Sequence, residues 1–151
     1  MVSFFLLLMM VWVVCSQQQR LAIEAARRVD LLGRQGRHSE AVEAFDGGKG
    51  LPASLAAIAW HNHGLSLTEL GRHGEAAAAF AACLEVGDGR REYDVLLKLG
   101  DALAKSEEWT RASEAYVRAS SLDESSSDGG LALANAGAAL LNIGGRSREA
   151  I

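Results

Sequence analysis

Proline, cysteine, aromatic residues and excess positive charge are all scarce in this sequence of 151 residues. The single proline, Pro52, leaves long stretches in which nothing interrupts a helix. Two cysteines, Cys15 and Cys83, are too few and too far apart to suggest a disulfide framework. The net charge of −4 and the isoelectric point near 5.5 argue against a nucleic-acid-binding surface, which normally carries a basic stripe. We therefore expect an all-helical protein.

Motifs that carry catalysis or hold a cofactor are missing as well. The sequence contains no glycine-rich phosphate loop, no zinc-type spacing of cysteine and histidine, and no nucleophile elbow. Its carboxylates are scattered over faces that are expected to be solvated. We therefore predict no enzymatic activity, no catalytic residue, no cofactor and no metal site within these residues.

A short pattern recurs about every 35 residues. In each copy an alanine is followed four residues later by an aromatic residue, behind a turn that contains glycine or a charged residue: Ala41 and Phe45, Ala76 and Phe80, Ala112 and Tyr116. The alanines are 35 and 36 residues apart, and an incomplete fourth copy occupies residues 145–150. Such a period is typical of stacked helical hairpins.

Apolar residues recur at helical spacing between the turns, which predicts helices in antiparallel pairs. The expected helices cover about residues 21–32, 39–45, 54–70, 74–86, 93–105, 110–121 and 131–143. Ser54 and Thr110 are expected to cap two of them. Residues 123–130 are rich in serine, aspartate and glycine, which predicts a loop.

On these residues the chain resembles tetratricopeptide repeat proteins, whose unit is a pair of antiparallel helices about 34 residues long. The pattern is clearest in the second, third and fourth units: Trp60, Gly64, Leu67, Gly71, Ala76, Phe80; Leu96, Gly100, Leu103, Ala112, Tyr116, Ala119; Leu133, Gly137, Leu140. The first unit departs from it, because Val29 and Gly48 stand where the family has small residues and alanine. The resemblance implies an α-solenoid of three hairpins and part of a fourth, in units of about 22–56, 57–92, 93–129 and 130–151.

The recurring small residues have a physical role in such a stack. Gly64, Gly100 and Gly137 are expected where the two helices of a hairpin cross, with the repeated alanines opposite them. The repeated aromatic residues are expected to fill the gap to the next hairpin, where each would bury a large ring. Since no hairpin can bury its apolar face alone, several units are needed for stability.

The four histidines are better explained by packing than by chemistry. His38 and His73 occupy the same place in successive copies, where the third copy has Trp109. His61 and His63 are two apart on one predicted helix and therefore point to nearly opposite sides, so they cannot share a ligand. His61 is expected to face the inner groove.

The resemblance implies a protein-interaction scaffold, in which the first helix of each pair lines a groove for a peptide segment or a partner helix. The residues at the matching positions form a mixed surface with a mild acidic lean: Asp30, Arg34, His61, Leu65, Glu69, Leu97, Asp101 and Lys105. Family members that grip the acidic C-termini of heat-shock chaperones need lysine and asparagine where this chain has Ala26 and Asp30. That clamp is therefore not expected here.

Two other functions remain open. We expect the chain to be a fragment of a longer protein, truncated at residue 151. One alternative function is then that of the N-terminal repeat region of an enzyme such as a glycosyltransferase. A pentatricopeptide RNA binder has a similar period, but the acidic isoelectric point and the lack of a basic groove argue against nucleic acid as the partner.

Residues 1–20 form a hydrophobic leader ahead of the repeat domain at 21–151. Residues 2–15 are apolar apart from Ser3, which is typical of a signal peptide's hydrophobic region. The first basic residue, Arg20, follows this run, and that distribution favours a signal anchor. We expect membrane association or entry into the secretory pathway, or a cytoplasmic protein if the leader results from a wrong start codon.

Overall fold

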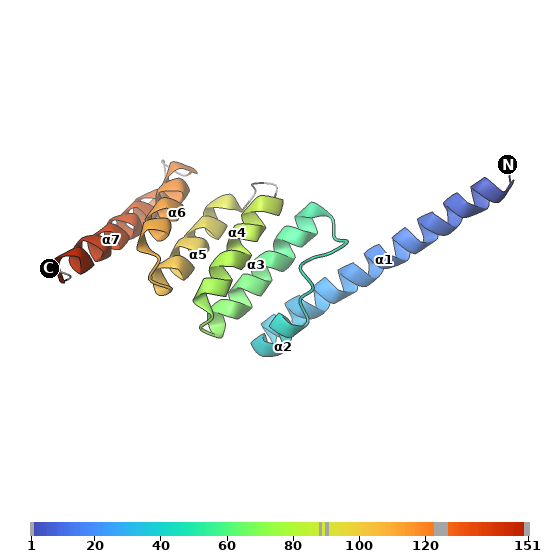
Figure 1. Cartoon of the computed structure of the whole chain (residues 1–151), viewed down its shortest axis with the longest axis horizontal. Coiled ribbons are helices and arrows are strands. Elements are labelled where there is room, and N and C mark those ends of the chain that lie inside the picture. The colour runs from blue at the N-terminus through green and yellow to red at the C-terminus, as the bar shows by residue number, and fades with distance from the viewer. Residues whose placement is uncertain (1, 88, 90, 123–126, 150–151) are drawn as a thin grey trace.

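The chain folds into a row of antiparallel helices (Figure 1). The computed structural model describes residues 2–87, 89, 91–122 and 127–149, and the side chains of residues 2–7, 127–129 and 144–149 are not considered. The seven helices of this part are α1 (Val2–Arg34), α2 (His38–Glu43), α3 (Ala53–Glu69), α4 (His73–Val86), α5 (Glu92–Lys105), α6 (Trp109–Leu122) and α7 (Ser127–Glu149). The described residues include no strand, so the all-α prediction is confirmed.

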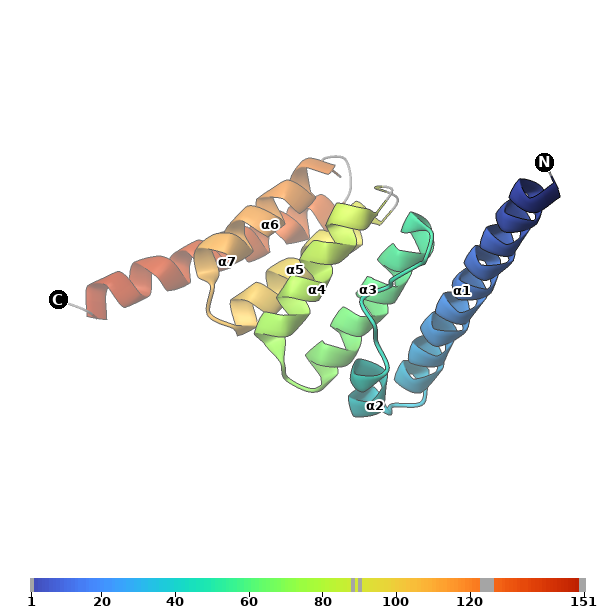
Figure 2. The same cartoon turned by 45° about the vertical axis from the view of Figure 1, so that its right-hand side comes forward.

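Each helix packs against the next one along the chain, and α1 also contacts α3. The helices pair as hairpins α1/α2, α3/α4 and α5/α6, and α7 lies against α6 at the end of the row (Figure 2). This arrangement is the α-solenoid of antiparallel hairpins that the repeated pattern predicts. The N-terminal part of α1 extends away from the row (Figure 1), and its residues 8–14 are exposed.

The same three-residue turn joins the two helices of every hairpin. Its middle residue has a positive φ in all three copies, at Gly36 (73°), Gly71 (72°) and Glu107 (65°). The amide that follows donates a hydrogen bond of 2.9 Å back to a carbonyl of the first helix, from Arg37 to Leu32, from Arg72 to Leu67 and from Glu108 to Leu103. These bonds satisfy carbonyls that the helix end would otherwise leave unpaired. The recurring sequence pattern therefore marks the hairpin turn and the start of the second helix.

Glycine lets an aromatic ring sit directly on the first helix of a hairpin. A Cβ atom at Gly64 would lie 2.7 Å from the Phe80 ring, and one at Gly100 would lie 2.6 Å from the Tyr116 ring. Phe80 and Tyr116 are 1% and 4% exposed, so neither ring has room to move aside. The expected close approach at these two glycines is therefore present.

The residues that contact these two glycines are not the ones expected. Phe80 and Tyr116 cover the glycine of their own hairpin, where alanine was expected, because the ring reaches across the helix crossing. Phe45 does reach the next hairpin, since its ring lies 4.6 Å from Trp60 and 4.1 Å from His63, centroid to centroid. Gly137 is open, because a Cβ there would meet none of the described atoms within 4 Å.

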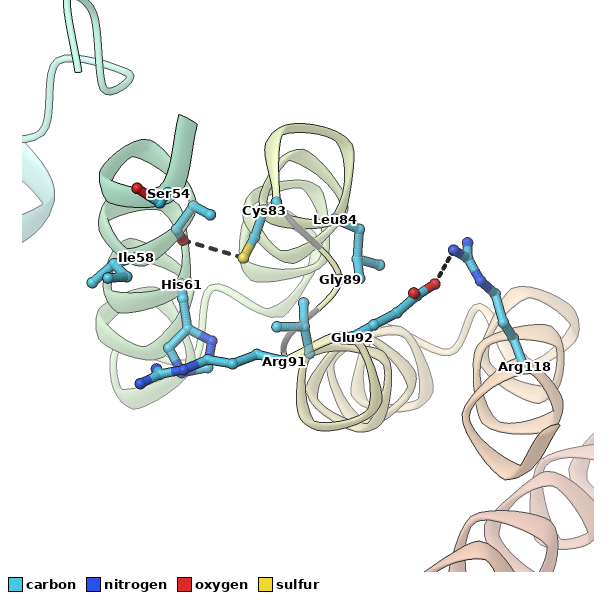
Figure 3. A pocket seen from close by; sticks show the side chains of 12 residues that line it. Ser54, Ile58, His61, Cys83, Leu84, Gly89, Arg91, Glu92 and Arg118 are labelled. Carbon is cyan, nitrogen blue, oxygen red and sulfur yellow. Dashed lines mark hydrogen bonds and ion pairs between the residues drawn. The ribbon is translucent and has the colours of Figure 1, made fainter. Parts of the chain in front are cut away.

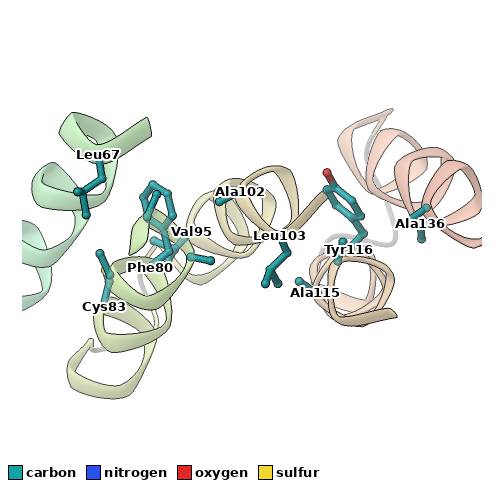
Figure 4. Packing of buried hydrophobic residues seen from close by; sticks show 14 residues of the cluster. Leu67, Phe80, Cys83, Val95, Ala102, Leu103, Ala115, Tyr116 and Ala136 are labelled. Atoms are coloured by element: carbon teal, nitrogen blue, oxygen red, sulfur yellow. The ribbon is translucent and has the colours of Figure 1, made fainter. Parts of the chain in front are cut away.

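One apolar cluster runs through the middle of the row (Figure 4). It begins at Leu67 on α3, includes both Phe80 and Tyr116, and ends at Ala136 and Ala139 on α7. A smaller cluster of Val29, Leu32 and Ala41 joins α1 to α2. Each hairpin thus buries its apolar face against its neighbour, as a repeat array requires.

Three local predictions are wrong. Ser54 and Thr110 cap no helix: the carbonyl of Pro52 accepts the first hydrogen bonds of α3, and α6 begins at Trp109, so both residues lie within a first turn. The expected break after residue 143 is absent, because α7 continues through Gly144 and Gly145 to Glu149. Glycine costs a helix only about 1 kcal/mol and need not end it. Part of the expected loop is helical from Ser127, and residues 123–126 lie outside the described part.

The leader and the first repeat share one helix. α1 passes from Val2 to Arg34 without a break at the expected boundary near residue 20. Within the part of the chain that the structure describes, no helix has the length and apolar character needed to cross a membrane. The boundary and the targeting role of the leader stay predictions.

Adding one methyl group to Gly100 tests the packing of aromatic rings on glycine. Gly100→Ala places a Cβ against the buried Tyr116 ring, and we expect the free energy of unfolding to fall by about 1–3 kcal/mol. Gly137→Ala is the matched control: it meets open space and gains helix propensity, so stability should rise by about 0.5–1 kcal/mol. Urea denaturation followed by circular dichroism measures both. Equal effects of the two changes would contradict the packing.

Candidate functional site

The residues that the sequence singled out for a groove lie on α1, α3 and α5, the first helices of the three hairpins. Within each helix they are four residues apart and so share one face: Asp30 and Arg34; His61, Leu65 and Glu69; Leu97, Asp101 and Lys105. Their environments differ, because some of them contribute to the fold itself.

Asp30 links α1 to α3. Its Oδ1 accepts a hydrogen bond of 2.9 Å from the Asn62 side-chain amide, and its Oδ2 lies 3.0 Å from Nε of Arg34. Both carboxylate oxygens are therefore engaged within the protein. Arg34 remains largely exposed beside it, so the basic end of this pair is the part open to a ligand.

Asp101 is engaged in a similar way. The Tyr116 hydroxyl donates a hydrogen bond of 2.7 Å to Oδ1 of Asp101, which holds the ring that covers Gly100. Burial, this bond and the aspartate charge raise the pKa of Tyr116, so the hydroxyl keeps its proton. Asp101 thus ties the groove face to the core of its own hairpin.

Four candidates are exposed, and of these Arg34 is paired with Asp30. Leu65 is 37% exposed, and Arg34, Glu69 and Lys105 are exposed beside it in the row. Leu97 is only half-buried, because it packs at the edge of the core. The free surface is therefore apolar at Leu65 and of both charge signs around it.

A pocket of about 430 Å³ opens beside His61, between α3, α4 and α5 (Figure 3). Apolar and polar side chains line it in similar measure, and its charged residues lie at the start of α5 and on α6. The lining residues are Ser54, Ala57, Ile58, His61, Cys83, Leu84, Gly87, Gly89, Arg91, Glu92, Val95 and Arg118. His61 is the one groove candidate among them, so it connects the predicted groove to this pocket.

His61 is 7% exposed, and its Nδ1 has no hydrogen-bond partner among the described residues. Burial lowers the pKa of its imidazole, while Asp94 raises that pKa and Arg91 and Lys98 lower it further. The ring also contacts Phe80 edge-on, with centroids 5.9 Å apart. At neutral pH the imidazole is therefore uncharged, and its unpaired Nδ1 is buried.

Cys83 lines the pocket as a buried thiol. Its Sγ–H donates to the carbonyl oxygen of Ala57 at 3.2 Å, which connects α4 to α3. Burial raises the pKa of the thiol, so the reactive thiolate is disfavoured. Cys83 is a structural residue of the wall, as its place on an apolar helix face suggests.

The charged residues of the pocket were missed by sequence reasoning. The Arg91 side chain reaches from the start of α5 toward His61 (Figure 3). Glu92 pairs with Arg118 of α6, which lies 26 residues further along the chain. Helical spacing groups Ser54, Ile58 and His61 on one face of α3, but nothing in the sequence brings Arg118 to them.

The remaining histidines pack. His63 stacks on Phe45, with an interplanar angle of 21°, and burial lowers the pKa of its imidazole. His38 and His73 are the first residues of α2 and α4 and are half-buried, in the place that Trp109 takes at the start of α6. Within the described ranges, no group of three or more potential ligand residues could hold a metal ion.

The two histidines with lowered pKa values predict how stability depends on pH. Below about pH 6.5 the unfolded chain protonates both imidazoles, whereas the folded chain keeps them neutral to a lower pH. The free energy of unfolding should therefore be highest above that pH and fall as the pH is lowered below about 6.5. Urea denaturation of a His61→Gln/His63→Gln variant should show a shallower fall; an unchanged slope would contradict the assignment.

Comparison with known proteins agrees with this geometry. Residues 57–86, in α3 and α4, match the family model described as tetratricopeptide repeat. No curated protein matches the sequence. Among solved structures, the chain is similar to the first TPR of Spaghetti (RPAP3) bound to the HSP90 peptide SRMEEVD, with a TM-score of 0.62 and 16% identity, over 80% of this chain and 93% of that one. The chain therefore contains a tetratricopeptide repeat and has the fold of tetratricopeptide repeat proteins.

Proposed function

We propose that the chain is a protein-interaction scaffold that binds an extended peptide segment along α1, α3 and α5. The observation that carries this proposal is the pocket of about 430 Å³ beside His61, on the helix face that also exposes Leu65. A pocket next to the exposed residues of α1, α3 and α5 gives a peptide one anchoring point and a surface along which it can bind. The similar structure of Spaghetti (RPAP3) holds a peptide of HSP90, which supports binding of this kind.

The residues that line the pocket indicate which side chains the bound peptide would carry. Ile58, Leu84 and Val95 provide apolar wall, so the anchoring side chain is apolar. Arg91 is placed to attract a carboxylate, while burial keeps His61 neutral at the same point. The peptide that fits best therefore has a large apolar residue next to an acidic one.

The chaperone peptide SRMEEVD is not the expected ligand. The α1 end of the row presents Ala26 and Asp30, and Asp30 adds negative charge where an acidic peptide would approach. Arg34 offsets part of that charge. SRMEEVD therefore serves as a reference peptide for weak binding.

The proposal assigns no catalytic role to these residues. The matched repeat family and the similar structure are both of the binding type. The two buried titratable side chains of the pocket are not paired with each other, since the Cys83 thiol donates to the Ala57 carbonyl and Nδ1 of His61 has no hydrogen-bond partner among the described residues. We further propose that residues 2–15 serve in membrane association, which the exposed apolar side chains at 8–14 support.

Screening the chain against a display library of random peptides tests the groove. We expect selected peptides to lose at least about tenfold in affinity with Leu65→Lys, because the charge is placed in the middle of the apolar row. Val117→Lys is the matched control, since Val117 is 49% exposed on α6, a second helix. Peptides selected with the Arg91→Ala variant should contain the acidic residue next to the apolar anchor less often.

If the selected peptides bind the Leu65→Lys variant with unchanged affinity, the groove is excluded as their binding site. Loss of binding with Val117→Lys instead would place the partner on the second helices. Equal circular dichroism spectra and melting curves of the variants show that each one is folded.

A further inference from the structure

The groove face of α3 carries two exposed apolar side chains at a fixed spacing. Ile58 and Leu65 are seven residues apart and are 42% and 37% exposed. Seven residues are nearly two turns of an α-helix, so these side chains point in nearly the same direction and lie about 10.5 Å apart along the helix axis. We call this pair the apolar ladder. A ligand can therefore make an apolar contact with α3 at two points with that separation.

A basic ladder with the same period follows α5. It consists of Arg91, Lys98 and Lys105, which are successively seven residues apart. All three are exposed, and none of them forms an ion pair with another of the described residues. Arg91 directly precedes α5, and the two lysines lie within it. Positive charge therefore recurs along this helix about every 10.5 Å.

The basic ladder lies on the side of α5 that faces α3. Arg91 and His61 line the same pocket, and the Arg91 side chain reaches toward His61 (Figure 3). Lys98 acts on His61 as well, since its charge lowers the pKa of that imidazole. Lys105 shares the face of Lys98, because it lies nearly two turns further along α5. The two ladders therefore border the same seam between α3 and α5, and the pocket lies at the beginning of that seam.

Acidic residues beside the ladders restrict where a ligand can lie. Asp94 and Asp101 are exposed on α5 next to the basic ladder, and Asp101 already accepts a hydrogen bond within its own hairpin. They would repel an acidic ligand, so its carboxylates are held against the basic ladder. Glu69 is exposed on α3, near the end of the seam that has Lys105. Lys98 is therefore expected to contribute more to binding than Lys105.

The period that both ladders share sets the spacing of side chains in the ligand. A chain in the polyproline II conformation rises about 3.1 Å per residue and completes one turn in three residues. Side chains three positions apart therefore point in the same direction and are roughly 9.3 Å apart, which is close to the step of the ladders. In a β-strand the side chains on one face recur every second residue, at roughly 6.7 Å, which matches neither ladder.

We propose that the seam between α3 and α5 binds an extended segment of a partner protein in which an apolar residue and an acidic residue recur at every third position. The apolar side chains contact Ile58 and Leu65, and the acidic side chains pair with Arg91 and Lys98. This inference rests on the proposed peptide-binding function and specifies the sequence pattern of the ligand. Because the ladders recognise side chains, the segment needs no free C-terminus.

Fluorescence anisotropy of a labelled peptide, measured with the full chain, tests this period. The probe consists of three units of leucine, glutamate and proline in that order, with blocked ends, because proline favours the polyproline II conformation. We expect saturable binding that weakens at least about tenfold when the same residues are shuffled to break the period. Replacement of every glutamate by glutamine should have an effect of the same size.

Variants of the chain locate the contact. Lys98→Gln should weaken binding about three- to tenfold, and Lys98→Glu should weaken it further, because the first change removes an attracting charge and the second adds a repelling one. Lys49→Glu is the matched control, since it reverses the charge of an exposed residue in the loop between α2 and α3. It should change the affinity by less than about twofold. Equal melting curves show that each variant is folded.

Four results would overturn the proposal. The first is the absence of binding by the ordered peptide at millimolar concentration. The second is equal binding of the ordered and the shuffled peptide, and the third is an equal loss of affinity with Lys49→Glu and Lys98→Glu, which would mean that only net charge matters. The fourth is tighter binding of a helix-forming peptide with leucine and glutamate at every seventh position, which would make a helix the occupant.

These results are separable from a failure of the groove itself. If peptides selected from the random library lose affinity with Leu65→Lys but lack the period of three, the groove is the binding site and the proposed ligand pattern is wrong. If no selected peptide responds to Leu65→Lys, the proposed function fails together with this inference.

Discussion

The contact between an aromatic ring and a glycine is the interaction on which the rest of the structure depends. The rings of Phe80 and Tyr116 lie on Gly64 and Gly100 at distances that leave no room for a methyl group. This contact sets how closely the two helices of a hairpin approach each other. It also places the first helices in a row, and the pocket beside His61 forms between consecutive members of that row. The geometry of the proposed binding face is therefore a consequence of the packing inside the hairpins.

The regular part of this architecture can be predicted from the sequence because the repeated positions have one physical reason each. Gly36 and Gly71 suit the turn position where φ is positive, and the recurring alanines are fully buried. The period alone therefore gives the helices and their order. The ends of the helices are harder to predict, because weak local preferences compete there. Ser54 fits a cap on its own, but Pro52 already supplies the first carbonyl of α3.

The candidate site was predictable only in part, since it combines residues of separate hairpins. The face of α1, α3 and α5 follows from helical spacing, and His61 was expected on it. Asp30 and Asp101 accept hydrogen bonds from Asn62 and Tyr116 because of the way neighbouring helices pack. Helical spacing within the sequence does not predict that packing. The pairing of Glu92 with Arg118 depends on the same packing. The sequence therefore predicts which face is presented, and the structure shows which of its polar groups are free.

The unbroken course of α1 makes the leader and the first hairpin parts of one stiff rod. A helix of 33 residues is roughly 50 Å long and rotates by about 100° at every residue. Whatever holds residues 2–15 therefore also sets the direction in which Arg34 and the groove face. Insertion of one residue between positions 15 and 21 would turn that face by about 100° about the rod, and insertion of seven residues would restore it to within about 20°. A change in helix phase between positions 15 and 21 would thus turn the groove face without touching the site.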